Sequence, residues 1–251
     1  MQIALIGAGN VATILGRLLQ DKGHRVVQVI NRRLETARVL GERLNTAYTD
    51  FSGTPHPQAD CYLVAVSDFA LQEHLPNFDF QGKPVFHTAG SVSKDILKPL
   101  SNHYGVLYPL QSLRKEMIEI PPIPFLVDGC NEAVQQVLLD LAGSLSNQVQ
   151  IASDEYRMKI HAAAVVVSNF TNHLYALAAD YCQHESVDFR LLMPLINETA
   201  QRIQYFPPES VQTGPAIRKD IGTLDKHLRL LHDYPKLRTV YLRLTDSIMN
   251  P

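Results

Sequence analysis

The first residues of the chain contain a glycine pattern whose spacing suits phosphate binding. Residues 7–12 read GAGNVA, which is the pattern G-x-G-x-x-A. The first glycine permits a tight turn, and the second lets the backbone approach a pyrophosphate because it has no Cβ. The helix expected to begin there offers unpaired N–H groups and a partial positive charge. The alternative is a glycine-rich turn kept for packing alone. The predicted cofactor residues of this turn are Gly7, Ala8, Gly9, Asn10 and Val11.

The end of the second predicted strand discriminates between NAD and NADP. NAD sites place Asp or Glu there, and the carboxylate accepts a hydrogen bond from the ribose 2′-OH. Residues 30–33 read INRR, with no acid at the strand tip. Two guanidinium groups can clamp a 2′-phosphate, and Asn31 can hydrogen-bond to ribose or phosphate. Asn31, Arg32 and Arg33 therefore favour NADP. The alternative is that both arginines are solvated first-turn residues of the next helix, where Glu35 is a nearby partner.

Two further loops follow strands that should end at the same edge of the sheet, where open α/β sheets bind ligands. The first loop is residues 66–68, which we expect primarily to cap a helix. The same loop can also contact the nicotinamide ribose. The second loop follows His87, which we interpret as a structural residue, and its small side chains let a cofactor ring lie close. The predicted cofactor contacts in these loops are Val66, Ser67, Asp68, Thr88, Ala89 and Gly90.

A long apolar helix expected after residue 153 carries a row of polar side chains. Ser168, Asn169 and Asn172 follow His161 by seven, eight and eleven residues. At 3.6 residues per turn, these offsets place all four near one face. Such a stripe can line a substrate pocket, with His161 as general acid. It can equally form hydrogen bonds between helices in a helical core. Both interpretations stay open.

Residues 213–218, TGPAIR, predict an anion site at a helix start. Pro215 suits the first turn of a helix that we expect to run to residue 232, with Thr213 or Gly214 as its cap. The free N–H groups of that turn, with Arg218 one turn further, suit a substrate carboxylate. Thr213 and Arg218 are therefore the predicted carboxylate anchor. The alternative is an ordinary helix start with a surface pair between Arg218 and Asp220.

Other constellations point away from hydrolase and metal chemistry. The sequence contains no Ser-His-Asp order, no HExxH helix and no clustered metal ligands, so we expect no metal. Cys61, Cys130 and Cys182 are scattered without CxxC spacing, which is typical of reduced, buried thiols. In the segment PLQS, Gln111 and Ser112 are hydrogen-bonding groups that can line a cleft at the end of a strand.

Alternating strands and helices must position these residues in the first three fifths of the chain. Short apolar runs predict the strands, and amphipathic periodicity predicts the helices between them. The predicted strands are residues 2–7, 25–30, 61–66, 84–88, 105–108, 123–127 and 148–151. The predicted helices are residues 10–22, 34–44, 68–75, 94–100 and 131–145. This alternation predicts an α/β Rossmann domain with a doubly wound, mostly parallel sheet.

The pattern changes after residue 152, where only helices are expected. They cover residues 154–182, 187–205, 215–232 and 235–248, with Pro194 as a kink in the second. We therefore predict a Rossmann domain at residues 1–152 and an all-α domain at residues 153–251. The broad apolar faces of these helices serve either a dimer contact or the core of the domain itself.

Composition limits the partners. The 251 residues include 23 Lys and Arg against 25 Asp and Glu, which argues against nucleic acid or an anionic membrane as the main partner. The most apolar run, residues 162–167, is too short to span a bilayer, which takes about 20 residues. No basic and apolar leader precedes the first strand, so we expect a cytoplasmic protein.

Taken together, the motifs resemble those of one Rossmann-like family. They are GAGNVA, NRR, VSD, HTAG, PLQS, the H-x6-SN helix and TGPAIRKD, and they span essentially the whole chain. The family has a helical C-terminal domain of no assigned function. It is related to pyrroline-5-carboxylate reductase, to the deazaflavin-dependent NADP oxidoreductases and, more distantly, to 6-phosphogluconate dehydrogenase-like enzymes. The resemblance implies an NADP site and a homodimer formed through the helical domain.

We therefore predict an NADP(H)-dependent oxidoreductase acting on a small carbonyl or imine, with a carboxylate on the substrate. His161 is the candidate proton donor, and Ser168, Asn169 and Asn172 are orienting groups. Two alternatives remain. One is a non-catalytic NADP-binding sensor or interaction protein, since no catalytic acid or base is recognisable. The other is hydride exchange between NADP and a deazaflavin.

Overall fold

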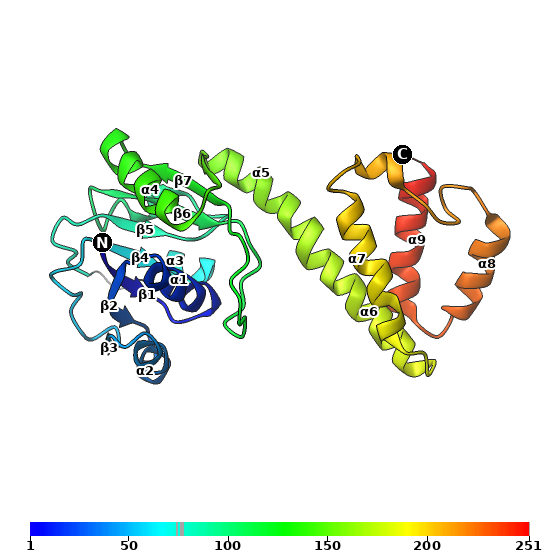
Figure 1. Cartoon of the computed structure of the whole chain (residues 1–251), viewed down its shortest axis with the longest axis horizontal. Helices are drawn as coiled ribbons and strands as arrows, with labels where there is room; N and C mark the ends of the chain where they lie inside the picture. The colour runs from blue at the N-terminus through cyan, green and yellow to red at the C-terminus, as the bar shows by residue number, and fades with distance from the viewer. Residues whose placement is uncertain (74, 76–77, 251) are drawn as a thin grey trace. The chain divides into compact units, whose positions relative to one another are not determined.

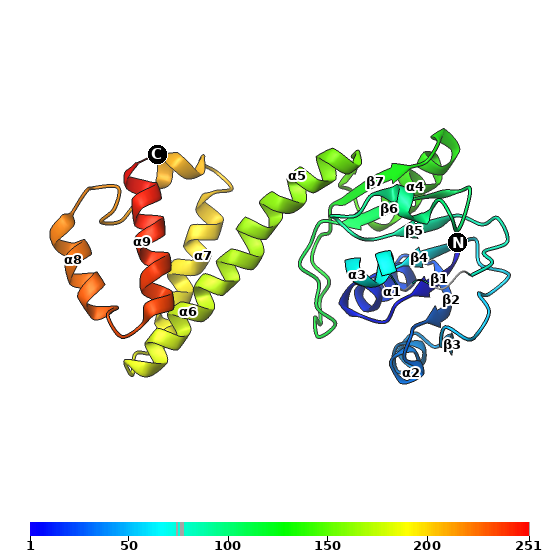
Figure 2. The same ribbon diagram turned by 180° about the vertical axis from the view of Figure 1, so that it is seen from behind.

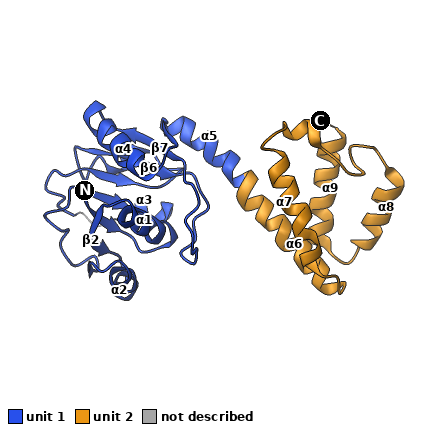
Figure 3. Cartoon of the chain, in the orientation of Figure 1, with its two compact units in different colours: residues 1–165 blue, residues 166–251 orange. Residues whose placement is uncertain are grey.

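The computed structural model describes residues 1–73, 75 and 78–250, and the chain divides into two compact units (Figure 3). The first unit is Met1–Val165 and the second is Val166–Pro251. The last strand ends at Ile151, and every later described element is helical. The change of secondary structure thus falls where the sequence predicts it, whereas the compact units divide later, inside the long helix that follows.

An eight-stranded sheet forms the centre of the first unit (Figures 1 and 2). Its order is β3-β2-β1-β4-β5-β6-β7-β8. Only the β6–β7 pair is antiparallel among the described strands. The predicted doubly wound, mostly parallel sheet is therefore confirmed. The strands are β1 (Gln2–Ile6), β2 (Arg25–Ile30), β3 (Ala47–Thr49), β4 (Cys61–Val64), β5 (Val85–His87), β6 (Tyr104–Pro109), β7 (Phe125–Gly129) and β8 (Val149–Ile151).

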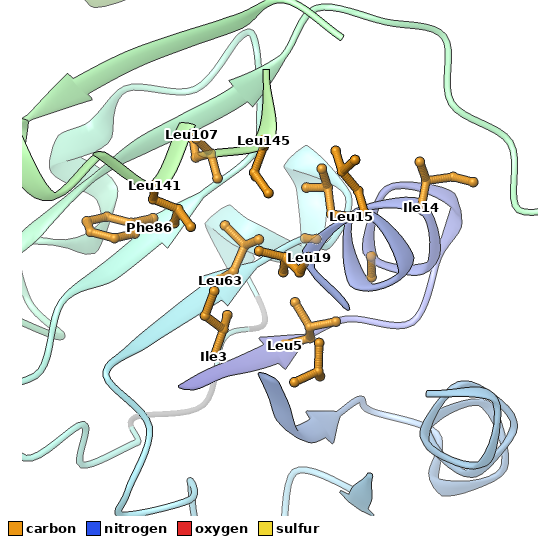
Figure 4. Close-up of a cluster of buried hydrophobic side chains, with 14 of the residues drawn as sticks. Ile3, Leu5, Ile14, Leu15, Leu19, Leu63, Phe86, Leu107, Leu141 and Leu145 are labelled. Carbon is orange, nitrogen blue, oxygen red and sulfur yellow. The ribbon is translucent and has the colours of Figure 1, made fainter. Parts of the chain in front are cut away.

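Two hydrophobic layers hold helices on both faces of the sheet. Along β1, Ile3 and Leu5 face one layer while Ala4 and Ile6 face the other, because successive side chains of a strand alternate. The first layer receives apolar side chains from α1 (Asn10–Asp21), α2 (Leu34–Arg43) and α4 (Glu132–Leu145), and the second receives them from α3 (Asp68–Glu73) and η1 (Lys94–Leu97). Figure 4 shows Ile3, Leu5, Leu63, Phe86 and Leu107 of the sheet against Ile14, Leu15, Leu19, Leu141 and Leu145.

Polar side chains cap several helices of the first unit. Ser93 and Asn131 accept backbone N–H bonds at the starts of η1 and α4. β3 is a short strand that the sequence pattern missed. The helix predicted at residues 94–100 is a 3₁₀ helix that ends at Leu97. The described part of α3 ends at Glu73, and Leu75, where the predicted helix ended, is not helical, while His74 lies outside the described residues. The helices are α1 (Asn10–Asp21), α2 (Leu34–Arg43), α3 (Asp68–Glu73), η1 (Lys94–Leu97), α4 (Glu132–Leu145) and α5 (Asp154–Ala164).

The long helix after the sheet contains a wide turn. The α-helical α5 passes into a π-helix, η2 (Val165–Phe170), before α6 (Thr171–His184) resumes the α-helical path. Thr171 Oγ1 donates to the carbonyl of Val166, five residues back, within this wide turn. The prediction of one α-helix is therefore wrong over these residues, and the 3.6-residue spacing does not carry from His161 to Ser168.

Two more helix predictions in the second unit are corrected. Residues 187–205 do not form one kinked helix, because η3 (Phe189–Leu192) precedes α7 (Met193–Arg202) and Pro194 lies in the first turn of α7. No helix begins at Pro215 either: residues 215–219 form turns, and Lys219 has φ +54°, which interrupts a right-handed helix. The remaining elements are η4 (Pro208–Val211), α8 (Ile221–Leu230) and α9 (Pro235–Met249).

The second unit buries very little of its apolar surface. In Figure 3, α6, α7 and α9 lie near one another while α8 stands apart. Neither α7 nor α9 contains a buried residue. Fifteen large hydrophobic side chains of the described residues are exposed here, including Leu191 at 74% and Leu195 at 62%. The buried side chains of the described part of this unit are Cys182, Ala216, Leu224 and Leu231.

Candidate functional site

A pocket of about 460 Å³ lies at the carboxyl ends of β1, β2 and β4. This edge is where open α/β sheets bind nucleotides, since β1 pairs with β2 on one side and with β4 on the other. Eight of the predicted cofactor residues line the pocket. They are Gly7, Ala8, Gly9, Asn31, Arg32, Arg33, Val66 and Ser67.

The turn between β1 and α1 has the geometry that the two glycines predict. Gly7 has φ +116°, and a Cβ there would lie 2.2 Å from the Ala65 carbonyl oxygen. A Cβ on Gly9 would meet nothing within 4 Å, so that space is open to a ligand. Gly9 is the N-cap of α1, with no side chain accepting from the first N–H groups and no acid in the first turn. These groups fit a pyrophosphate.

The two arginines after β2 are available to a phosphate. Arg32 and Arg33 are exposed, and no ion pair or side-chain hydrogen bond of theirs occurs among the described residues. Glu35 does not pair with them: it binds Arg38 at 2.6 Å instead. Asn31 Nδ2 donates to the Arg33 carbonyl at 3.1 Å, which fixes the turn that presents both guanidinium groups. The residues present therefore fit a 2′-phosphorylated dinucleotide.

Three of the predicted cofactor residues make hydrogen bonds within the chain. Asn10 Oδ1 accepts the Lys115 N–H at 3.2 Å. Ser67 caps α3 by accepting from Ala70 N–H at 3.3 Å, and Asp68 accepts a short hydrogen bond from the Ser91 hydroxyl. Asn10, Val11, Asp68, Thr88, Ala89 and Gly90 do not line the pocket.

Several residues that line the pocket are not among the predicted cofactor residues. Thr36 follows the two arginines, and Ala65, Phe69 and Ala70 surround the predicted loop at Ser67. Phe51 and Lys115 come from distant connections, which no local pattern could place here. The only sequence signal for Lys115 was its position in the connection after β6, whose carboxyl end lies at the same edge as those of β1 and β5.

A tyrosine and a histidine meet further along the same sheet edge. Tyr108, in β6, and His161, in α5, both belong to the first unit, and the Tyr108 hydroxyl lies 2.9 Å from His161 Nδ1. A Cβ on Gly90 would lie 2.7 Å from His161 Nδ1 and 2.8 Å from Tyr108 Cζ, so a larger residue there would displace one of these two side chains. Burial raises the pKa of Tyr108. In the sheet, β6 lies four strand positions away from β2, which corresponds to roughly 19 Å.

A buried polar network supports the loop that contains Gly90. The Arg157 side chain is 1% exposed and donates to the Val92 carbonyl and to Asp154. His87 Nδ1 accepts from Ala89 N–H at 3.1 Å, and its Nε2 lies 3.2 Å from the Ser93 carbonyl. Burial first, and then the nearby Arg157 charge, lowers the pKa of His87 to about 4. These contacts agree with the structural role that the sequence predicts for His87, and the lowered pKa keeps its ring neutral at pH 7.

The second unit holds the other predicted catalytic residues. Asn169 and Asn172 are exposed, Ser168 is half-buried, and their side chains form no hydrogen bonds among the described residues. Arg218 and Thr213 lie in the irregular segment before α8, whose N-terminus is capped by Asp220 at 3.1 Å from Thr223 N–H. The anion site at a helix start is therefore wrong, and the roles of all five residues stay predictions.

Gln111 and Ser112, the predicted cleft groups of the PLQS segment, make hydrogen bonds within the chain. Gln111 Nε2 donates to the Pro122 carbonyl at 3.3 Å, and Gln111 Oε1 accepts from Ser112 N–H at 2.9 Å. Elsewhere, the described residues hold no group of three or more His, Cys, Asp or Glu side chains suited to a metal ion. None of the described helices is long and apolar enough to cross a membrane.

Comparison with known families decides the membership of the chain. Residues 123–248, half of the chain, match the family described as "Domain of unknown function (DUF2520)". The chain belongs to the DUF2520 family. Residues 2–89 match a second family, described as "NADP oxidoreductase coenzyme F420-dependent". The resemblance drawn from the motifs is confirmed, and NADP in that description agrees with Arg32 and Arg33.

Solved structures share this fold over the whole chain. A Bacteroides fragilis protein named as a candidate NADP oxidoreductase is 37% identical, with a TM-score of 0.90 over 100% of this chain and 98% of its own. A reductive aminase from Aspergillus terreus, solved with NADPH and ethyl-5-oxohexanoate, has a TM-score of 0.71 at 14% identity, over 98% and 92%. A 1-pyrroline-5-carboxylate reductase from Streptococcus pyogenes has 0.63 at 15%, over 100% and 99%. The last two show the fold alone. No protein of curated function matches the chain.

Proposed function

We propose that this DUF2520 protein is an NADP(H)-dependent oxidoreductase that reduces a small carbonyl or imine substrate bearing a carboxylate. The observation that carries the proposal is the arrangement along one sheet edge. A pocket suited to phosphates lies at β1, β2 and β4, and the Tyr108–His161 pair lies at β6, beside Gly90. NADPH, when bound, supplies the hydride. The names of the B. fragilis protein and of the two reductases agree with this reaction class.

In this proposal, His161 provides the proton. The Tyr108 hydroxyl donates to Nδ1 when Nε2 carries the only ring proton, and its oxygen accepts from Nδ1–H when Nδ1 carries a proton. When the ring is protonated, Nδ1–H donates to the Tyr108 oxygen and Nε2–H can be released to a substrate atom that gains negative charge. Tyr108 thus holds the ring in one orientation in both states, which makes it a positioning residue.

Three polar residues of the second unit keep their predicted role as orienting groups in this proposal. Ser168, Asn169 and Asn172 carry neutral hydrogen-bonding groups, and Ser168 and Asn169 lie in the π-helix η2, an element often found at functional sites. Arg218, with Thr213, is the proposed anchor of the substrate carboxylate. Because no helix begins at Pro215, no helix N-terminus contributes to this anchor, and the Arg218 guanidinium group alone supplies the positive charge.

NADPH consumption tests the reaction. We expect the nicotinamide absorbance to fall with at least one member of a panel of 2-keto acids and cyclic imines. His161→Ala should then lower kcat by about 100-fold. Tyr108→Phe, which keeps the ring but not the hydroxyl, should shift the pH profile of kcat.

Tight NADPH binding without turnover of any substrate would instead favour a sensor. Turnover only with a deazaflavin would favour hydride exchange between NADP and a deazaflavin.

We also propose that the protein is a homodimer formed through the second unit. Fifteen exposed large hydrophobic side chains against four buried side chains leave this unit without a core of its own. An apolar surface of this kind is unusual in a monomer and typical of permanent interfaces. A second copy of the chain is the occupant that the family resemblance implies.

A further inference from the structure

The connection between β6 and β7 forms an ordered strap beside the pocket. We use the name strap for residues 110–122, which run past α1 in Figure 1. Two hydrogen bonds close its base: Leu110 N–H donates to the Pro124 carbonyl at 2.8 Å, and Gln111 donates to that of Pro122 at 3.3 Å. The strap therefore begins and ends at one place on the sheet.

The outer part of the strap is fixed to the first two helices. Arg17 donates to the carbonyls of Met117 at 2.5 Å and Ile118 at 2.7 Å, and Arg43 donates to that of Lys115 at 3.4 Å. Leu113 is buried in the same hydrophobic layer as α1. These hydrogen bonds and this packing offset the conformational entropy that is lost when the strap becomes ordered. The strap therefore holds the backbone of Lys115 in a defined position before any ligand binds.

Lys115 lines the pocket with its ammonium group uncommitted. The backbone N–H of Lys115 donates to Asn10 Oδ1 at 3.2 Å, and Asn10 is the first residue of α1. The neighbouring Glu116 pairs with Arg114 at 3.4 Å, and no ion pair of Lys115 occurs within the described part of the chain. The strap thereby brings a positive charge next to the helix N-terminus that suits a pyrophosphate.

We propose that Lys115 is a cationic contact to the pyrophosphate of NADP(H), and that Asn10 is the positioning residue that holds the strap there. The inference rests on the NADP site of the proposed function. Charge supports the division of roles. Arg32 and Arg33 serve the 2′-phosphate, whereas the turn at Gly9 offers the pyrophosphate only N–H dipoles. A lysine suits this task as a compact charge that needs no fixed fork geometry.

Titration calorimetry with NADP⁺ and NAD⁺ tests the assignment. Lys115→Met should weaken both cofactors by the same factor, about tenfold, because both contain the pyrophosphate. Arg32→Ala should weaken NADP⁺ alone. Lys98→Met removes the same charge from an exposed position of the first unit that does not line the pocket, so it should leave both affinities within twofold. Lys115→Arg should retain most of the affinity.

A double-mutant cycle tests the role of Asn10. Asn10→Ala should weaken NADP⁺ severalfold in the wild-type background and have little further effect beside Lys115→Met, since both act through one contact. Additive losses would overturn the positioning role. If the wild type binds NADP⁺ but Lys115→Met changes neither affinity, or only that for NADP⁺, the pyrophosphate assignment is wrong. If the wild type binds neither cofactor, the proposed function itself fails.

Discussion

Arg32 and Arg33 carry the cofactor preference in this account. They follow β2 without an acid at the strand tip, and Glu35 is occupied by Arg38. Arg32→Ala or Arg33→Ala should weaken NADP⁺ at least tenfold, or about 1.4 kcal/mol, and leave NAD⁺ within twofold. Calorimetry measures both. Arg38→Ala is the matched control, because its guanidinium group binds Glu35 and Glu42. Equal losses for both cofactors would refute the preference.

His87 makes the first unit sensitive to acid. Its folded pKa is lowered to about 4, so between pH 6.5 and 4 the unfolded chain binds a proton that the folded chain does not. The free energy of unfolding should fall by about 2 kcal/mol from pH 7 to pH 5 through this group, and the loss should level off below pH 4.

Urea unfolding at pH 7 and pH 5 measures this loss. In His87→Gln, the free energy of unfolding should differ between pH 7 and pH 5 by about 2 kcal/mol less than in the wild type, because the titrating imidazole is gone. Glutamine can still donate a hydrogen bond to the Ser93 carbonyl. His103→Gln, at a more exposed histidine, should retain the wild-type difference. An unchanged pH dependence in His87→Gln would show that other groups cause the acid sensitivity.

Single residues differ in how far the sequence reveals them. Gly7, Gly9 and Arg32 act through the local backbone next to them, so a short pattern finds them. Tyr108 and His161 meet only because β6 and α5 pack together, and Lys115 reaches the pocket only through the strap. Contacts of this kind depend on tertiary packing, which spacing along the chain does not encode.

The turn between β1 and α1 separates structural from functional glycine. Gly7→Ala should lower the free energy of unfolding by more than about 2 kcal/mol, because φ is +116° and the Cβ would collide with the Ala65 carbonyl. Gly9→Ala should leave stability within about 0.5 kcal/mol, since its Cβ meets open space. The same variant should weaken NADP⁺ at least tenfold. Urea unfolding measures the effect on stability, and calorimetry measures the effect on NADP⁺ binding. Unaltered NADP⁺ binding by Gly9→Ala would contradict a pyrophosphate site at this turn.

Helix starts in the second unit show where sequence patterns fail. Pro215 fits the first turn of a helix, but its φ also fits an ordinary turn, and Lys219 at φ +54° separates that turn from α8. Asp220, three residues before Thr223, is the actual cap. The π-helix at Val165–Phe170 is similarly silent in the sequence, because its residues have no helical period of their own.

The whole chain divides between a part that its sequence describes well and a part that it does not. Buried strands and amphipathic helices made the doubly wound, mostly parallel sheet predictable, apart from the short β3, whereas the order of its strands comes from the structure. The second unit lacks that regularity, because its helices bury few residues within one chain. Apolar positions that serve another surface cannot be distinguished by periodicity from a core.

The proposed homodimer predicts the mass and its response to mutation. Light scattering after size-exclusion chromatography should give twice the mass of one chain. Leu191→Glu with Leu195→Glu should shift the mass toward one chain at micromolar concentration, because it places charges on exposed apolar positions. Gln201→Glu, at an exposed polar position of α7, should retain the dimer. A wild type with the mass of one chain would contradict the proposal.

Thermal unfolding of the wild type with NADP⁺, with NAD⁺ and with neither tests the nucleotide site most directly. A ligand that binds only the folded state stabilises it by about 2.7 kcal/mol at 100 times its Kd. At equal concentrations, NADP⁺ should raise the unfolding midpoint clearly more than NAD⁺. Equal shifts would contradict the roles of Arg32 and Arg33, and no shift with either would show that the turn at Gly7 and Gly9 binds no dinucleotide.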